Sequence, residues 1–299
     1  MLNFFDMIGQ LFGYILWFFF DLFDNYPLAV ICFTVFIRLM MVPFDLKSRK
    51  ASAKMARLSK KQTELQKRYK NNKEKRNEEL AKLYQKEGAN PLGGCLPQIF
   101  PILSFMGVYA AIANPLTNMF HISADKISQA LKVLGESANR ASQLLLIKKI
   151  PMDQNLLGIF SDSEVHAIND FNKGFNLFGM DLSTVPINSQ FLNFAWVLPI
   201  LCIATMIASV VISQKLNFMP APQGAGCMKF FPYIMSIPFI WVVITAPSAL
   251  GLYYTISNVL VIVQNFLITK YYNPHIITAK QEAKRIALRN LEESKINRI

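Results

Sequence analysis

The chain has 299 residues, of which 53% are hydrophobic and 17% are charged, and its formal net charge is +12. Soluble domains carry about 25% charged residues, so this composition argues against a soluble domain. Several long uncharged runs account for the shortfall, and they predict an all-α polytopic membrane protein.

The first apolar run, residues 3–23, is interrupted by Asp6, Gln10 and Gly13 and has no Lys or Arg at either end. It can be read as a membrane span or as an aromatic-rich helix that lies in the plane of the membrane interface. We favour the second reading and predict an interfacial amphipathic helix over residues 1–25.

The next run, residues 27–46, is nearly all apolar and is long enough to cross a bilayer as a helix. Arg38 lies near its middle, where a charge costs roughly 3 kcal/mol on insertion scales. The interiors of the predicted spans contain no Asp, Glu, Lys or His. The sequence therefore offers Arg38 no counter-ion within the membrane.

Two environments for Arg38 remain open. In the first, it is packed against backbone carbonyls freed by prolines and against polar side chains of the other spans, with Gln98, Asn258 and Gln264 as candidates. In the second, it lies in a wet cavity inside the bundle, where a visiting carboxylate could bind it.

Residues 47–87 contain 15 Lys or Arg against five Glu, which is the strongest positive-inside signal of the chain and places the segment in the cytoplasm. From Met55 to Tyr69, mainly apolar residues recur at spacings of three and four and form one seam on a helix. Asn71-Asn72 predicts a turn, and a second run with the same spacing ends at Gly88. We predict an antiparallel helical hairpin. It is either a solvated basic face or a docking surface for lipid headgroups, ribosomal RNA or acidic parts of a nascent chain.

A second apolar run over residues 89–115 contains Pro97, Gln98 and Pro101. Residues 116–190 then carry six basic and seven acidic side chains, a balance that predicts a segment outside the cytoplasm. One helical stripe runs from Ile127 to Leu145, with Ser123 as its N-cap and Pro151 beyond its end. We expect the remainder of this segment to be loop.

Three further spans follow, and a basic tail ends the chain. Five spans place the N-terminus outside and the C-terminus in the cytoplasm. The predicted organisation is an interfacial helix (1–25), a first transmembrane helix (26–46), a cytoplasmic hairpin (47–88), a second transmembrane helix (89–115), an extracytoplasmic loop with an amphipathic helix (116–190), transmembrane helices three to five (191–270) and a cytoplasmic basic tail (271–299).

The residues for covalent or metal chemistry are missing from the predicted spans. The four cysteines form no CxxC pair, and the three histidines lie outside the spans, so we predict neither a metal site nor a cofactor. Intramembrane hydrolysis needs a nucleophile with a base, paired carboxylates or a metal. We therefore expect no enzymatic activity and no catalytic residues.

Three stretches together, FTVFIRLMMVP followed by a basic hairpin, NPLGGCLPQIFPI, and PSALGLYYTISNVLVIVQ, resemble the YidC/Oxa/Alb family of membrane protein insertases. The resemblance covers roughly residues 27–114 and 191–270 and implies a five-helix insertase core of the short bacterial type. It implies that Arg38 is the arginine of a hydrophilic groove, Thr34 a polar groove position and Tyr254 an aromatic that contacts substrate. Gln98 and Asn258 are candidates on polarity and depth alone. The segment 116–190 is longer than the family leads us to expect.

The function that the resemblance implies is insertion and folding of nascent membrane proteins in the bacterial plasma membrane, alone or with a Sec translocon. The implied partners are nascent chains, the ribosome and anionic lipids, with no specific nucleic-acid sequence. The alternatives are a channel or transporter in which Arg38 is an anion site, and a scaffolding protein in which Arg38 is structural. The candidate docking residues are Lys60, Lys61, Lys67, Arg68, Lys284 and Arg285.

Overall fold

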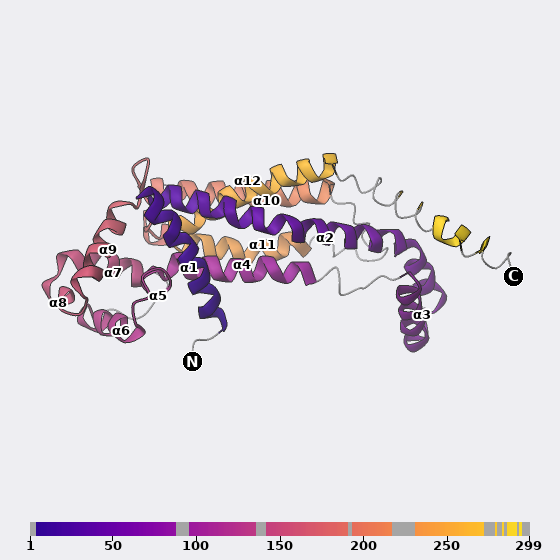
Figure 1. Ribbon diagram of the computed structural model, residues 1–299, viewed down its shortest axis with the longest axis horizontal. Coiled ribbons are helices and arrows are strands. Elements are labelled where there is room, and N and C mark those ends of the chain that lie inside the picture. Colours follow the sequence, from indigo (N-terminus) through magenta and orange to yellow (C-terminus); the bar gives the residue numbers. More distant parts are fainter. Residues whose placement is uncertain are drawn as a thin grey trace. The chain divides into compact units, whose positions relative to one another are not determined.

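The computed structural model describes residues 4–87, 96–135, 142–190, 193–216 and 231–271, together with 279, 283, 286–291, 293 and 294. Within these residues the chain is helical apart from one short two-stranded sheet (Figure 1), which confirms the predicted all-α class. The long helices are α1 (Phe4–Phe23), α2 (Tyr26–Arg68), α3 (Lys73–Lys86), α4 (Leu96–Ala113), α10 (Val197–Leu216), α11 (Phe231–Thr245) and α12 (Ser248–Tyr271).

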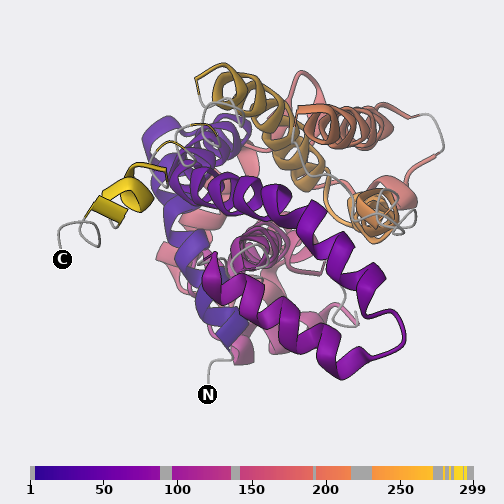
Figure 2. The same cartoon turned by 90° about the vertical axis from the view of Figure 1, so that its right-hand side faces the viewer.

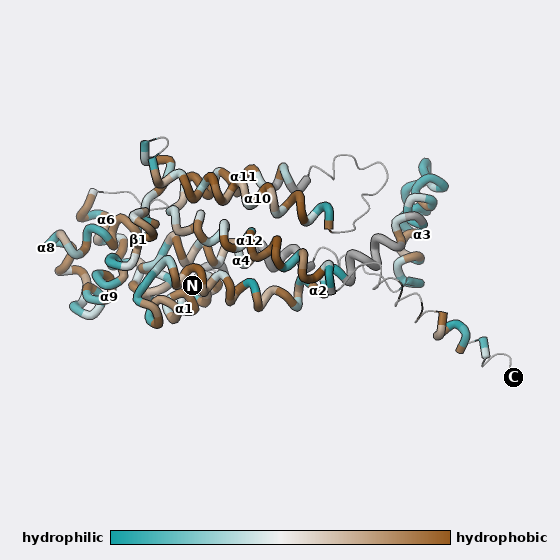
Figure 3. The backbone as a smooth tube through the Cα atoms, turned by 90° about the horizontal axis from the view of Figure 1, so that it is seen from above, coloured by the Kyte–Doolittle hydropathy of each residue, from teal (hydrophilic) through white to brown (hydrophobic). Residues whose placement is uncertain are grey.

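Three helices of the described residues are long and apolar enough to cross a membrane. They cover Tyr26–Arg49 in α2, Phe194–Leu216 with α10, and Ser248–Lys270 in α12. Apolar residues also dominate α4 and α11 (Figure 3), so each of the five predicted spans coincides with a helix. Together these helices make a polytopic membrane protein.

The chain divides into two compact units. The first comprises residues 1–40, 100–209 and 233–260, and the second comprises residues 41–99, 210–232 and 261–299. Several long helices contribute residues to both units.

In the first unit, α1 packs closely against α4 and α5 (Pro115–Asn118) because glycines lie at the crossing. A Cβ atom added to Gly13 would lie 2.0 Å from the backbone oxygen of Asn118, and one added to Gly107 would lie 2.4 Å from the ring of Phe12. A larger residue at either position would push the helices apart. The opposite face of α1 exposes a stripe of large apolar side chains: Met7, Leu11, Tyr14, Phe18 and Leu22.

Residues 115–190, which we call the capping segment, contain several helices and a small sheet in their described parts, 115–135 and 142–190, where the sequence suggested one amphipathic helix and otherwise loop. Its elements after α5 are α6 (Ala124–Val133), α7 (Ser142–Lys149), the 3₁₀ turn η2 (Ile150–Met152), α8 (Gln154–Leu157), α9 (Asp162–Lys173), β1 (Asn176–Leu177), β2 (Met180–Asp181) and the 3₁₀ turn η3 (Pro186–Asn188). A 3₁₀ turn, η4 (Phe194–Trp196), then leads into α10. The loop prediction was wrong because polar surface residues conceal a small apolar core.

That core consists of side chains that are fully shielded from solvent, with Ile147, Ile150, Leu156, Ile168 and Phe171 all at 0% exposure. The ring of Phe171 lies 4.7–5.2 Å from the rings of four neighbours in edge-on geometry: Phe20, Tyr26, Phe120 and Phe175. Aromatic pairs at such distances each contribute about 0.5–1.5 kcal/mol beyond the area they bury. Phe171 thereby joins the capping segment to α1 and α2.

The single helix expected from Ile127 to Leu145 is interrupted. Ser123 caps α6 as predicted, accepting a hydrogen bond from the backbone of Lys126, but the helix ends at Val133, and Gly135 follows with φ +67°. Glycine adopts this left-handed conformation at no steric cost, so it terminates helices. Residues 136–141, which belong to the predicted stripe, lie outside the described residues.

The second unit contains the predicted hairpin. The helix α2 continues through the expected boundary at residue 46 as far as Arg68, and α3 begins after an N-cap at Asn72. Lys61 Nζ pairs with Glu87 Oε1 at 3.0 Å, and Leu58 of the predicted seam is 1% exposed. Figure 2 shows α3 returning beside the end of α2, as an antiparallel hairpin requires.

Candidate functional site

Arg38 of α2 meets a neutral partner inside the first unit. Its Nε donates a hydrogen bond of 2.8 Å to Ser257 Oγ of α12, and Nη2 donates to the same oxygen. Among the residues that the structure describes, no carboxylate pairs with Arg38. The guanidinium has five N–H donors, so this contact orients the side chain without neutralising it.

The rotation of α12 decides which polar residue reaches Arg38. Residues four apart share a helix face, and Ser257 lies on the same face as Tyr253, whose ring is 6.2 Å from that of Phe33 in α2. Gly251 lies on a different face, where an added Cβ would sit 3.2 Å from Leu198 of α10. The close approach at Gly251 thereby turns Ser257 toward α2.

Asn258, which we selected from the sequence, lies on the α10 face. Its Nδ2 donates to Thr205 Oγ1 at 3.3 Å and to the carbonyl oxygen of Cys202 at 3.4 Å. Of the candidates for a partner of Arg38, Asn258 thus bonds to α10, whereas Ser257, which precedes it by one residue and a rotation of about 100°, bonds to Arg38.

Gln264 is also not a partner of Arg38. It belongs to a polar cluster within the second unit, where its Nε2 donates to Asp45 Oδ2 at 2.8 Å. Beside it in sequence, Asn265 is 5% exposed, accepts a hydrogen bond from Arg49, and donates to Ser213 Oγ at 2.7 Å. Our site prediction did not include this cluster. Its signal in the sequence was the pair of consecutive amide side chains, Gln264 and Asn265, within an apolar run.

The two positions implied by the family resemblance have different surroundings. Thr34 is fully buried, and its hydroxyl donates a hydrogen bond of 2.6 Å to the carbonyl oxygen of Val30. The hydrogen-bonding need of Thr34 is therefore met within α2. The ring of Tyr254 stacks at 5.5 Å on Phe105 of α4. The hydroxyl of Tyr254 is buried and makes no hydrogen bond to the described residues.

A second buried hydroxyl lies near Arg38. Ser104 of α4 has a buried Oγ without a hydrogen bond among the described residues. The phenol of Tyr253 lies close to both Ser104 and Ser257 and interacts electrostatically with Arg38. Helices α2, α4 and α12 thus bring the hydroxyl groups of Ser104, Tyr253, Tyr254 and Ser257 and the cation of Arg38 into a mainly apolar bundle.

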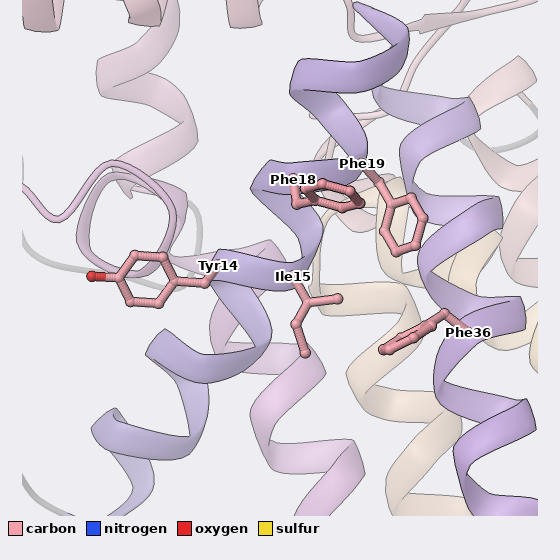
Figure 4. Close-up of a pocket in the computed structure, with 5 residues that line it drawn as sticks. All are labelled: Tyr14, Ile15, Phe18, Phe19 and Phe36. Carbon is pink, nitrogen blue, oxygen red and sulfur yellow. The ribbon is translucent and has the colours of Figure 1, made fainter.

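The opposite face of α2 is apolar. Phe36 lies two residues before Arg38, and with Tyr14, Ile15, Phe18 and Phe19 of α1 it lines a cavity of about 280 Å³. Ile15, Phe19 and Phe36 point into the space between the two helices, whereas Tyr14 extends to the other side (Figure 4) and stacks on His121 at 3.9 Å. The cavity has no polar lining and is separate from the site around Arg38.

The docking candidates on the hairpin are not equivalent. Lys61 is engaged with Glu87, whereas Lys67 and Arg68 are exposed and make no ion pair within the described part of the chain. The side chains of Lys60 and Gln98, and the residues Lys284 and Arg285, lie outside what the structure describes. Across the described residues, no three His, Cys, Asp or Glu side chains cluster as a metal site would require.

The family model described as 60Kd inner membrane protein matches residues 18–275 of this chain. The chain belongs to this family. Among the family's curated members, proteins named membrane protein insertase YidC from Chloroherpeton thalassium and Chlorobium limicola are each 28% identical to it. The alignments cover 88% and 82% of this chain but only 36% and 33% of those relatives.

A third relative of the same name, from Prosthecochloris aestuarii, is 28% identical over 270 residues, or 90% of this chain and 35% of its own. This chain therefore spans about a third of the length of the curated relatives it matches. The resemblance drawn from the three sequence stretches is confirmed, and with it the assignment to a multi-pass membrane protein family.

Proposed function

We propose that this chain is a membrane protein insertase that receives nascent membrane proteins at a hydrophilic groove containing Arg38. Family membership supports the activity. The observation that carries the role of Arg38 is its contact with Ser257, because a cation whose partner among the described residues is a neutral hydroxyl keeps its charge available.

The proposed mechanism is electrostatic recruitment followed by release into lipid. At about 4 Å and an effective dielectric constant near 20, an arginine–carboxylate pair gains roughly 4 kcal/mol before desolvation is subtracted. That is enough to attract an acidic segment of a nascent chain and weak enough to let it leave. Ser257 positions the guanidinium while its other N–H groups contact the substrate, and no covalent bond changes.

The buried hydroxyl of Tyr254 fits the same proposal. A buried polar group without a hydrogen bond costs about 1–3 kcal/mol, and a passing polypeptide carbonyl would accept the missing bond. Thr34 and Asn258 have their hydrogen bonds satisfied by α2 and α10. We propose that these two residues shape the site and that Tyr254 contacts the substrate.

We further propose that the hairpin and the C-terminus lie in the cytoplasm, and that the N-terminus and the capping segment lie outside it. The positive-inside rule supports this orientation, since residues 47–87 carry 15 of the 31 Lys and Arg residues of the chain. Lys67 and Arg68 would contact anionic lipids or the ribosome. The insertase would act alone or beside a Sec translocon.

Insertion assays on Arg38 variants test the proposal directly. Arg38→Lys retains the charge without the planar fork and should keep part of the activity. Arg38→Ala should fail most on substrates with acidic translocated tails, and Arg38→Glu should be worse on these. The measurement is insertion of one reporter with either an acidic or a neutral tail, at matched protein levels.

Arg49→Ala is the matched control, because Arg49 is also an arginine of α2 but is bonded to Asn265. It should show no preference between the two tails. If Arg38→Ala impairs both reporters equally, or if the variant is degraded, Arg38 is structural and electrostatic recruitment is wrong. A gain or loss of anion flux in vesicles, with insertion unchanged, would favour the channel or transporter.

A further inference from the structure

A small hairpin in the capping segment presents an aromatic ring that the proposed function does not use. Strands β1 and β2 are antiparallel, with Asn176 opposite Asp181 and Leu177 opposite Met180. Two residues, Phe178 and Gly179, make the turn between them. Phe178 is 92% exposed, the highest exposure of any large hydrophobic residue in the described chain.

The backbone at Phe178 is also unfavourable for this residue. Its φ is +50° and that of Gly179 is +83°, so both central residues of the turn are left-handed. Two-residue hairpins of this kind favour Asn-Gly or Gly-Gly, and a bulky side chain there is strained. An exposed aromatic ring in a strained conformation adds no packing to the fold, which points to a contact outside the chain.

The hairpin is held near the end of the membrane-crossing helices. The residues that follow β2 bond to the first turn of α12: Ala249 N donates to the carbonyl oxygen of Leu182, and Ser248 N donates to that of Thr184, both at 2.9 Å. β2 also packs on η4, which leads directly into α10. Three residues lie between Phe178 and Leu182, so their Cα atoms are at most about 13 Å apart, and Leu182 is hydrogen-bonded to the first turn of α12.

Figure 3 agrees with this placement. β1 lies at the edge of the capping segment that adjoins the long helices, whereas α8 lies at the far edge. Two candidate spans begin at Phe194 and Ser248, and Phe194 is itself 50% exposed. The hairpin is therefore attached where two candidate spans begin.

We propose that Phe178 inserts its ring into the interfacial region of the bilayer and anchors the capping segment to the lipid surface. Phe is among the residues that bury the apolar face of interfacial helices at the boundary of headgroups and acyl chains, and an apolar ring gains free energy by leaving water. The occupant of the exposed tip is thus lipid, on the same side of the membrane as the capping segment.

Tryptophan quenching in lipid nanodiscs tests this proposal on the full chain. Phe178→Trp is compared with Met152→Trp, a matched control that is 81% exposed in η2, next to α8 at the far edge. The nanodiscs contain phosphatidylcholine and phosphatidylglycerol with ordinary or brominated acyl chains, and wild-type emission is subtracted. The added emission should fall at least twofold in brominated lipid at position 178 and stay unchanged at position 152.

Equal quenching at the two positions would overturn the proposal. Shielding of position 178 from aqueous acrylamide without quenching by bromine would also overturn it, because a protein would then cover the ring.

A second variant, Phe178→Asn, keeps the test independent of folding, since asparagine tolerates positive φ. In detergent, protease should cleave the capping segment of this variant no faster than that of the wild type. In nanodiscs the wild type should gain at least twofold protection and the variant should not. Full protection of the variant in nanodiscs would refute anchoring by Phe178.

Discussion

The capping segment and the surroundings of Arg38 differ in whether their cations have counter-ions. In the capping segment, Lys126 pairs with Glu164 at 2.8 Å and Lys148 pairs with Asp181, so partly buried cations have counter-ions. Arg38, in an apolar bundle where pairing would gain most, is held by a serine. The contrast separates cations whose ion pairs stabilise a folded region from a cation that we propose to receive an acidic substrate.

The largest effect is expected from removing the aromatic centre of the capping segment. Phe171→Ala should destabilise the protein by about 3–5 kcal/mol, since a fully buried ring and its packing are lost. Denaturant unfolding measures this, with the exposed Phe178→Ala as the control, for which we expect no loss. A cost for Phe171→Ala below about 1 kcal/mol would show that the capping segment lacks a core of its own.

The difference between paired and unpaired cations extends to the hairpin. Replacing both Lys67 and Arg68 with Gln should weaken binding to anionic vesicles by about 2 kcal/mol, or roughly 30-fold, since each basic residue near the surface contributes about 1 kcal/mol. Lys61→Gln should change binding less, because Glu87 already neutralises Lys61. Co-sedimentation at low and high salt measures both. A larger effect from Lys61 would reverse our assignment of the docking residues.

Supplying Arg38 with a permanent counter-ion should abolish the contrast between the two regions. Ser257→Asp places a carboxylate where the serine hydroxyl contacts the guanidinium, and it should lower insertion of an acidic-tailed reporter by about tenfold, or 1.4 kcal/mol. The neutral-tailed reporter should be little affected. Ser257→Asn has nearly the same size without the charge and serves as the control. Equal losses with Asp and Asn would indicate a steric effect.

The smallest effect is expected when the pH is lowered and the ion pairs of the capping segment lose their contribution to stability. Burial raises the pKa of the Asp181 carboxyl, but hydrogen bonds from Lys148 and Ser183 and the charge of Lys148 outweigh it, so the pKa lies below its ordinary value of 3.8. A lowered folded-state pKa stabilises the fold at neutral pH, and this contribution is lost as the pH falls below about 3.8 through the folded value.

Because Asp181 keeps 36% of its side chain exposed, we expect the pair to contribute less than about 1 kcal/mol. Asp181→Asn should remove that part of the acid dependence, as measured by unfolding between pH 6 and pH 3. If the variant and the wild type lose stability in parallel over this range, the Lys148 pair does not contribute.

Much of this protein could be predicted from the sequence because the relevant physics is local or compositional. Apolar runs of membrane-spanning length, the basic hairpin with its turn at Asn72, the cap at Ser123 and the isolated charge of Arg38 all depend on residues close together in the chain. The bilayer imposes these patterns on any chain that crosses it.

The choice of Ser257 over Asn258, the pairing of Lys61, the aromatic core around Phe171 and the position of the Phe178 hairpin were decided by tertiary structure. Each depends on how a helix is rotated or on which distant segments meet, and periodicity carries no such information. A step of one residue turns a helix by about 100°, so adjacent polar residues in α12 face different neighbours, and only the packing at Gly251 determines which of them meets Arg38.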